Sequence, residues 1–129
     1  MAVSLLVGAC APSRGSATAA APADLTVALA GLCRAARSAR TGDLFEARRT
    51  FLDQSHEFLH ELAAKGDARA RAAVGRLFEA KQRVEAALGP DAEETPNDVA
   101  VLLARLEVAT RVLAGELGTP APRCGGAGG

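Results

Sequence analysis

Four stretches of this chain, all within residues 24–117, carry apolar residues at the three- and four-residue spacing of an amphipathic helix. No stretch alternates apolar and polar residues as a half-buried strand would. Short turn-forming links separate the four stretches: Thr41-Gly42-Asp43, Gly66-Asp67, and an acidic loop after Gly89-Pro90. Abundant alanine, leucine and arginine add helix propensity. The pattern therefore predicts an all-α fold.

The predicted helices cover about 24–40, 44–65, 68–88 and 98–117, and a chain of 129 residues suits one domain. Links of about two to eight residues between helices favour antiparallel neighbours. We therefore expect an antiparallel up-down-up-down four-helix bundle over residues 24–117. The buried stripe expected on the second helix is Leu44, Phe51, Ser55, Phe58 and Leu62. The broader set expected on the fourth helix is Val99, Leu102, Leu103, Leu106, Ala109, Leu113 and Leu117.

Two of the three cysteines are placed so that they can pair. Cys33 falls within the first predicted helix, and Cys124 lies in the Gly/Pro-rich tail of residues 118–129. In an up-down-up-down bundle the fourth helix ends beside the start of the first, within reach of an extended tail. We expect a Cys33–Cys124 disulfide that pins the tail and stabilises the fold by roughly a few kcal/mol. The alternative is two reduced thiols in a cytosolic protein.

The third cysteine ends a short apolar run, Leu5-Leu6-Val7-Gly8-Ala9-Cys10. Its last four residues resemble the lipobox of bacterial lipoproteins, although Gly8 stands where that family usually has Ala, Ser or Thr. The resemblance implies lipidation at Cys10, a signal-peptide remnant over residues 1–9, and a flexible linker over residues 10–23. It also implies an extracytoplasmic protein, in the periplasm or at the cell surface, anchored to a membrane by its lipid.

The nine residues before Cys10 contain no Lys or Arg. A secretory signal has a charged region followed by an apolar core of about 7–15 residues. Two interpretations follow: either the signal begins upstream of Met1, or these residues are an ordinary apolar N-terminus. A transmembrane helix needs about 20 apolar residues, which this run does not supply.

The balanced charge of the chain argues against a nucleic-acid partner but is compatible with a membrane-associated protein partner. Fifteen basic and fifteen acidic residues cancel, and the chain has no Trp or Tyr. A nucleic-acid surface needs a basic field and stacking aromatic residues, so we expect no nucleic-acid partner. A membrane-associated protein partner remains open, docked on the fourth helix or on arginines near the first link. Those arginines are Arg34, Arg37, Arg40, Arg48 and Arg49.

Both histidines belong to one motif, His56-Glu57-Phe58-Leu59-His60, on the second predicted helix. Residues four apart project from one face of a helix, so both imidazoles can reach one metal ion. The motif resembles the H-E-x-x-H of zinc-dependent metalloproteases, over five residues only. That resemblance implies zinc ligands at His56 and His60 and a general base at Glu57. Such a protease also needs a third ligand in a recognised downstream motif, which this sequence lacks.

A simpler metal site fits the same residues. On a regular helix, Asp53, His56, Glu57 and His60 form a partly exposed polar ridge beside the apolar stripe. Two imidazoles with one or two carboxylates suit Zn(II), Cu(II) or Ni(II), and open coordination positions suit metal transfer or buffering. The alternative is an ordinary polar surface.

Three functions follow as hypotheses. The leading one is a non-enzymatic extracytoplasmic lipoprotein that acts as an accessory or interaction module. Within it, a subsidiary hypothesis makes His56 and His60 a transition-metal site, with Asp53 or Glu57 assisting. The second is a structural subunit of a membrane-associated complex, without a metal. The third is a zinc-dependent metallohydrolase that acts through the H-E-x-x-H motif.

Overall fold

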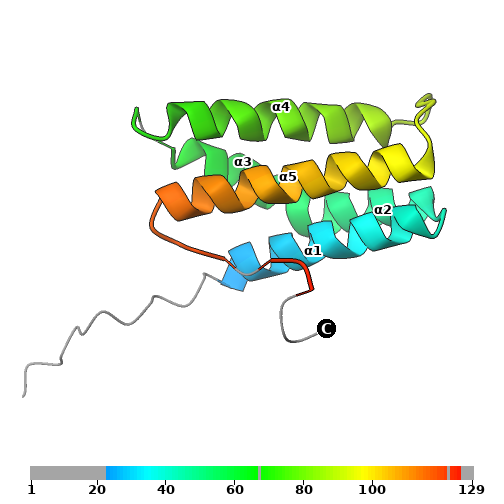
Figure 1. The fold of residues 1–129 in the computed structure, drawn as a ribbon, viewed down its shortest axis with the longest axis horizontal. Coiled ribbons are helices and arrows are strands. Elements are labelled where there is room, and N and C mark those ends of the chain that lie inside the picture. Colours follow the sequence, from blue (N-terminus) through cyan, green and yellow to red (C-terminus); the bar gives the residue numbers. More distant parts are fainter. Residues whose placement is uncertain (1–22, 67, 122, 126–129) are drawn as a thin grey trace, which may run out of the picture.

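The structure is a computed structural model that describes residues 23–125, apart from 67 and 122. Cys10, the expected signal remnant and nearly all of the expected linker lie outside the described residues. Within the described part, every element of secondary structure is helical, and the helices pack as a bundle (Figure 1). The elements are α1 (Ala23–Arg40), α2 (Leu44–Phe51), η1 (Leu52–His56), α3 (Glu57–Ala64), α4 (Arg71–Ala87) and α5 (Pro96–Glu116).

Four rods make up the bundle, because α2, η1 and α3 follow one another without a break. The rods alternate in direction, as the colours along the ribbon in Figure 1 show. α1 packs against α5 on one side and against α2 and η1 on the other, and α5 also packs against α4. α3 and α4 approach each other less closely than the other neighbouring rods do. The predicted antiparallel up-down-up-down four-helix bundle is confirmed.

Side-chain caps set where α2 and α5 begin. The Glu46 backbone N–H donates to Asp43 Oδ1 at 2.9 Å, which caps α2. The Asp98 backbone N–H donates to Thr95 Oγ1 at 3.2 Å, which caps α5. Pro96 lies in the first turn of α5, where a backbone N–H would have no partner within the helix, so proline fits there without losing a hydrogen bond. The last helix therefore begins slightly before its expected start at Asp98.

Leucine and alanine side chains from all four rods form one hydrophobic core. α5 contributes as its broad apolar face predicts. Four residues of the expected set are fully buried: Val99, Leu103, Leu106 and Leu113. The other three pack against the edge of the core: Leu102, Ala109 and Leu117.

The second rod contains a π-helical turn, η1, that its sequence pattern does not predict. A π turn holds more residues than an α turn, so the residues after it face another direction than on a regular helix. Phe58, expected in the buried stripe, is only partly buried, and its neighbour Leu59 is fully buried instead. Before the change of register, Phe51 and Ser55 are buried as expected.

Gly31 allows the π turn to lie close against α1. A Cβ atom at Gly31 would lie 2.6 Å from Ser55 Oγ and 2.7 Å from Gln54 Cβ, closer than such atoms pack. The same seam carries a buried hydrogen bond, in which the Ser55 hydroxyl donates to the Ala28 carbonyl oxygen at 2.7 Å. The close contact between α1 and η1 therefore fixes the direction of His56, the next residue of the chain.

The C-terminal tail returns across α1 (Figure 1). The Thr119 N–H and hydroxyl both donate to the Ala114 carbonyl oxygen, at 2.8 and 3.0 Å, where the chain leaves α5. Cys124 then lies at disulfide-bonding distance from Cys33, with 5.6 Å between the two Cα atoms. The structure thus brings together the two predicted cysteines across a sequence separation of 91 residues.

Candidate metal centre

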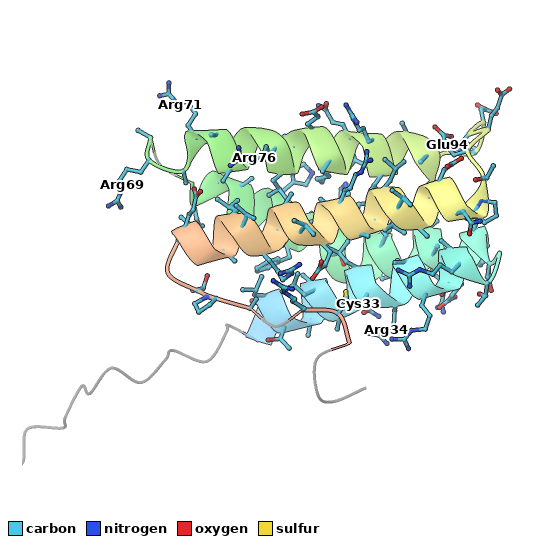
Figure 2. All side chains as sticks on the ribbon, in the orientation of Figure 1. Cys33, Arg34, Arg69, Arg71, Arg76 and Glu94 are labelled. Carbon is cyan, nitrogen blue, oxygen red and sulfur yellow. A yellow bond between two sulfur atoms is a disulfide. The ribbon has the colours of Figure 1, made fainter. Side chains whose placement is uncertain are left out.

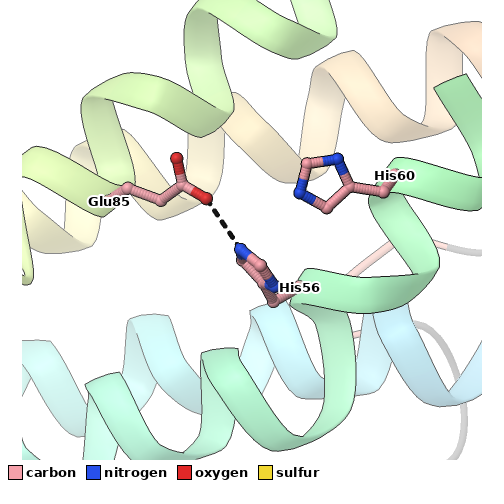
Figure 3. Close-up of side chains that lie close together, drawn as sticks. All are labelled: His56, His60 and Glu85. Atoms are coloured by element: carbon pink, nitrogen blue, oxygen red, sulfur yellow. Dashed lines mark hydrogen bonds and ion pairs between the residues drawn. The ribbon is translucent and has the colours of Figure 1, made fainter.

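η1 and α3 present the two histidines toward α4 (Figure 3). His56 is the last residue of η1, and His60 lies one turn later on α3. Their rings meet edge to face, with 5.0 Å between the ring centroids. The His56 ring also makes an edge contact with the buried Phe51 ring, 5.8 Å away between centroids. The two imidazoles therefore lie side by side, with His56 held by the core.

Glu85 of α4 completes a group of three side chains that could hold one metal ion. Its Oε1 atom lies 2.8 Å from His56 Nε2. One ligand atom from each of His56, His60 and Glu85 lies within 4.8 Å of the other two. Tetrahedral Zn(II), bound at about 2.0–2.1 Å, holds its ligand atoms about 3.4 Å apart. Small rotations of these side chains therefore suffice to bring the three atoms into coordination range.

Lys81, one helical turn before Glu85, adds a cation to the same group. Its side chain is 4% exposed, and its Nζ lies 3.3 Å from His56 Nε2 and donates to Glu85 Oε1. A buried ammonium group requires a partner, and Glu85 supplies a carboxylate. A metal ion bound here meets the positive charge of Lys81, which lowers the affinity of the site for cations.

The protonation of Glu85 reflects two opposing effects. Partial burial on its own raises the pKa of the Glu85 carboxyl, but the hydrogen bond and the charge of Lys81 lower it, and His56 lowers it further. The net result is a pKa of Glu85 below its ordinary value. Glu85 is therefore an ionised carboxylate at neutral pH, which is the state that a metal ligand requires.

The group is half open to solvent. The side chains of His56 and Glu85 are 31% and 35% exposed, and His60 is exposed. The looser packing of α3 against α4 leaves room for these long polar side chains between the two rods. Water can reach the coordination positions that the protein does not fill, which favours an exchangeable metal over a permanent structural one.

The structure places the two predicted carboxylates elsewhere. Asp53 and Glu57 line a depression of about 300 Å³ between α1 and the η1–α3 segment. Asp24 and Glu61 line the same depression. The expected polar ridge is therefore split between two faces: its histidines face α4, and its carboxylates lie on the α1 side.

The sequence prediction missed Glu85 because this residue lies on a different helix from the histidines. One signal in the sequence points toward it. Lys81 occupies a core-like position in the apolar pattern of its helix, and a buried ammonium needs a carboxylate nearby, most simply four residues away.

Comparisons with family models, curated proteins and solved structures gave no match to this chain. Among the described residues, no helix combines the length and the apolar character needed to cross a bilayer. The chemistry of the histidine–glutamate group is therefore the basis of the functional proposal.

Proposed function

We propose that this chain is a non-enzymatic extracytoplasmic lipoprotein whose helical bundle binds a divalent transition metal through His56, His60 and Glu85. The observation that carries the proposal is the convergence of two imidazoles and one carboxylate within 4.8 Å. These ligands come from two rods of the bundle, so the packing of η1 and α3 against α4 positions them before a metal arrives. Pre-positioned ligands lose less side-chain entropy on binding.

The ligand set narrows the choice of metal. Two imidazoles with a carboxylate suit Zn(II), Cu(II) or Ni(II), whereas Mg²⁺ and Ca²⁺ favour oxygen ligands. Three protein ligands leave at least one position for water or for an incoming ligand. Because Lys81 opposes a bound cation, we expect a Kd on the order of micromolar, or about −8 kcal/mol. Such an affinity suits buffering or transfer of the metal.

Two features of the chain support a place outside the cytoplasm. Disulfides persist in oxidising compartments, and Cys33 and Cys124 lie at bonding distance. The lipobox-like Val7-Gly8-Ala9-Cys10 is the basis for proposing Cys10 as the site of lipid attachment. A membrane is therefore the first proposed partner, and a membrane-associated protein is the second.

A structural subunit without a metal is the second candidate function, and one observation favours it. His56, Lys81 and Glu85 already form a connected group of polar contacts that ties the second rod to α4. In that case the group serves stability alone. Replacing His56 would then lower the free energy of unfolding equally with and without added metal.

Hydrolysis is not part of the proposal. A mechanism of the H-E-x-x-H type requires Glu57 beside a metal-bound water, and Glu57 lines the depression on the α1 side. We therefore expect metal binding without peptidase activity, which a peptidase assay of the zinc-loaded protein would check.

Calorimetric titration of the oxidised chain with Zn(II), Cu(II) and Ni(II) tests the proposal. A Cys10→Ser background removes the thiol outside the Cys33–Cys124 pair. We expect one ion per chain with a Kd on the order of micromolar. Binding should be lost in His56→Ala/His60→Ala and weakened about tenfold or more in Glu85→Gln, because a neutral amide is a poor ligand.

The matched control is Asp53→Asn/Glu57→Gln, which neutralises the two carboxylates on the α1 side. This variant should bind within about twofold of the unchanged protein, since solvent screens exposed charges at that distance. If the unchanged protein binds no metal, or if the double histidine variant binds equally well, the structural-subunit function replaces the metal proposal.

A further inference from the structure

A groove of about 270 Å³ lies between α4 and α5 on the outside of the bundle. Its lining includes the apolar residues Leu102, Val108 and Val112. Its rim carries arginines, of which Arg76 on α4 is labelled in Figure 2. The other rim arginines are Arg83 and Arg105. The groove therefore combines exposed apolar surface with positive charge.

The rim arginines differ in their partners. Arg83 pairs with Glu79 at 2.7 Å on the same helix. Within the described residues, no ion pair engages Arg76 or Arg105, and both side chains are exposed. Val108 and Val112 are 48% and 41% exposed beside them. The positive charge of the rim is thus largely uncompensated within the bundle, and the occupant it fits is acidic with apolar residues at its centre.

The depression between α1 and the η1–α3 segment has that character. Four carboxylates line it: Asp24, Asp53, Glu57 and Glu61. Among them lie Val27, which is 52% exposed, and the partly buried Phe58. The charges around this depression are thus opposite in sign to those around the α4–α5 groove.

The two surfaces lie on opposite sides of the bundle. The rods form a ring in the order α1, α2–η1–α3, α4, α5. The seam between α4 and α5 is therefore opposite the seam between α1 and the η1–α3 segment. Each copy of the chain carries both halves of a complementary pair, on faces that it cannot bring together within itself.

We infer that a second copy of this chain docks across the α4–α5 groove, with the carboxylates around its acidic depression facing the arginine rim. A contact between two different faces is heterologous, and opposite faces repeat it into an open row of bundles rather than a closed dimer. The contact lies away from the α3–α4 seam, so it is independent of metal binding.

Sedimentation velocity of the oxidised full chain in the Cys10→Ser background tests the inference. The weight-average mass should rise with protein concentration at low salt and fall when salt is added. Arg76→Glu/Arg105→Glu makes both faces acidic, and Asp53→Lys/Glu61→Lys makes both faces basic. Each variant alone should associate at least about tenfold more weakly than the unchanged protein, because like charges then face each other.

An equimolar mixture of the two charge-reversed variants should regain association, because each acidic face then meets a basic one. The mixture also shows that both variants are folded. The control Arg48→Glu/Arg71→Glu, with exposed arginines outside both surfaces, should associate as the unchanged protein does. A chain that stays monomeric at millimolar concentration, or variants that associate unchanged, would overturn the inference, as would a mixture that stays monomeric.

Discussion

At the level of single residues, Lys81 would have two opposing effects on the proposed metal site: its charge holds Glu85 in place and also repels a bound cation. In the absence of a metal its ammonium group partners the Glu85 carboxylate inside the α3–α4 seam. When a metal ion binds to the same carboxylate, the ammonium becomes an unfavourable neighbour. In the proposed site, Lys81 would therefore lower the affinity for a metal ion without being a ligand.

We expect Lys81→Met to tighten metal binding. Methionine matches the length of lysine without its ammonium nitrogen and suits a buried position, so it removes one positive charge close to the ion. Two charges a few ångströms apart interact by more than 1 kcal/mol even at high dielectric, so the Kd should fall about tenfold or more. Zinc titration measures the change, with Lys65→Met at an exposed lysine as the control. A Kd that rises in Lys81→Met would show instead that Lys81 holds Glu85 in place for the metal.

The lowered pKa of Glu85 predicts how stability depends on pH. A carboxyl whose pKa is lower in the folded state contributes stability above its unfolded value and loses that contribution as the pH falls through the folded value. The unchanged protein should therefore exceed Glu85→Gln in free energy of unfolding from neutral pH down to about pH 5, and the difference should shrink as the pH falls further, through the lowered folded-state pKa. Urea unfolding followed by circular dichroism gives this difference. A gap that widens in acid would contradict the account.

At the level of elements, the π turn decides which face of α3 meets α4. Helical periodicity predicts the rods well because their leucines and alanines recur at regular spacing. It cannot predict η1, since a helical projection assumes a constant rotation per residue and the π turn depends on contacts with α1. Gly31 and Ser55 make those contacts, from positions far apart in the sequence. As a result of the π turn, Leu59 is buried in the core where the regular helical pattern predicts Phe58.

Gly31→Ala should destabilise the bundle. The added Cβ meets Ser55 Oγ and Gln54 Cβ, and overpacking of this kind costs about 1–3 kcal/mol. Denaturant unfolding measures the loss. Gly75→Ala on α4 is the matched control, because nothing lies within 4 Å of its added Cβ and alanine favours a helix. Equal stability of the two variants would mean that α1 and η1 can separate without cost.

At the level of the whole molecule, the order of the helices along the chain accounts for the Cys33–Cys124 pair but not for the position of Glu85 beside the histidines. The pairing of Cys33 with the tail required only that the first and last rods be neighbours, which short links already predict. The position of Glu85 beside the two histidines, in contrast, depends on how two rods are rotated about their axes. That rotation depends on the π turn and on a buried lysine, which helical periodicity does not predict; in the structure Asp53 and Glu57 lie on the α1 side.

Loss of the disulfide should weaken the fold and leave the metal centre intact. A bond across 91 residues restricts the unfolded chain, so Cys33→Ser/Cys124→Ser should lower the free energy of unfolding by about 2–4 kcal/mol. The tail crosses α1, away from the α3–α4 seam, so the zinc affinity of the folded variant should not change. Denaturant unfolding and zinc titration on the same sample test both statements. A large loss of affinity would mean that the tail supports the site.

In the proposed site, His56, His60 and Glu85 bind one metal ion between two rods of the bundle. The chain has only two histidines, so ¹⁵N-histidine labelling gives one imidazole signal set for each. On zinc titration we predict that the ring nitrogens of both histidines shift together and stop shifting at one equivalent, and that Glu85→Gln weakens the response. Ring nitrogens that stay unchanged, or that respond at only one histidine, would contradict the claim.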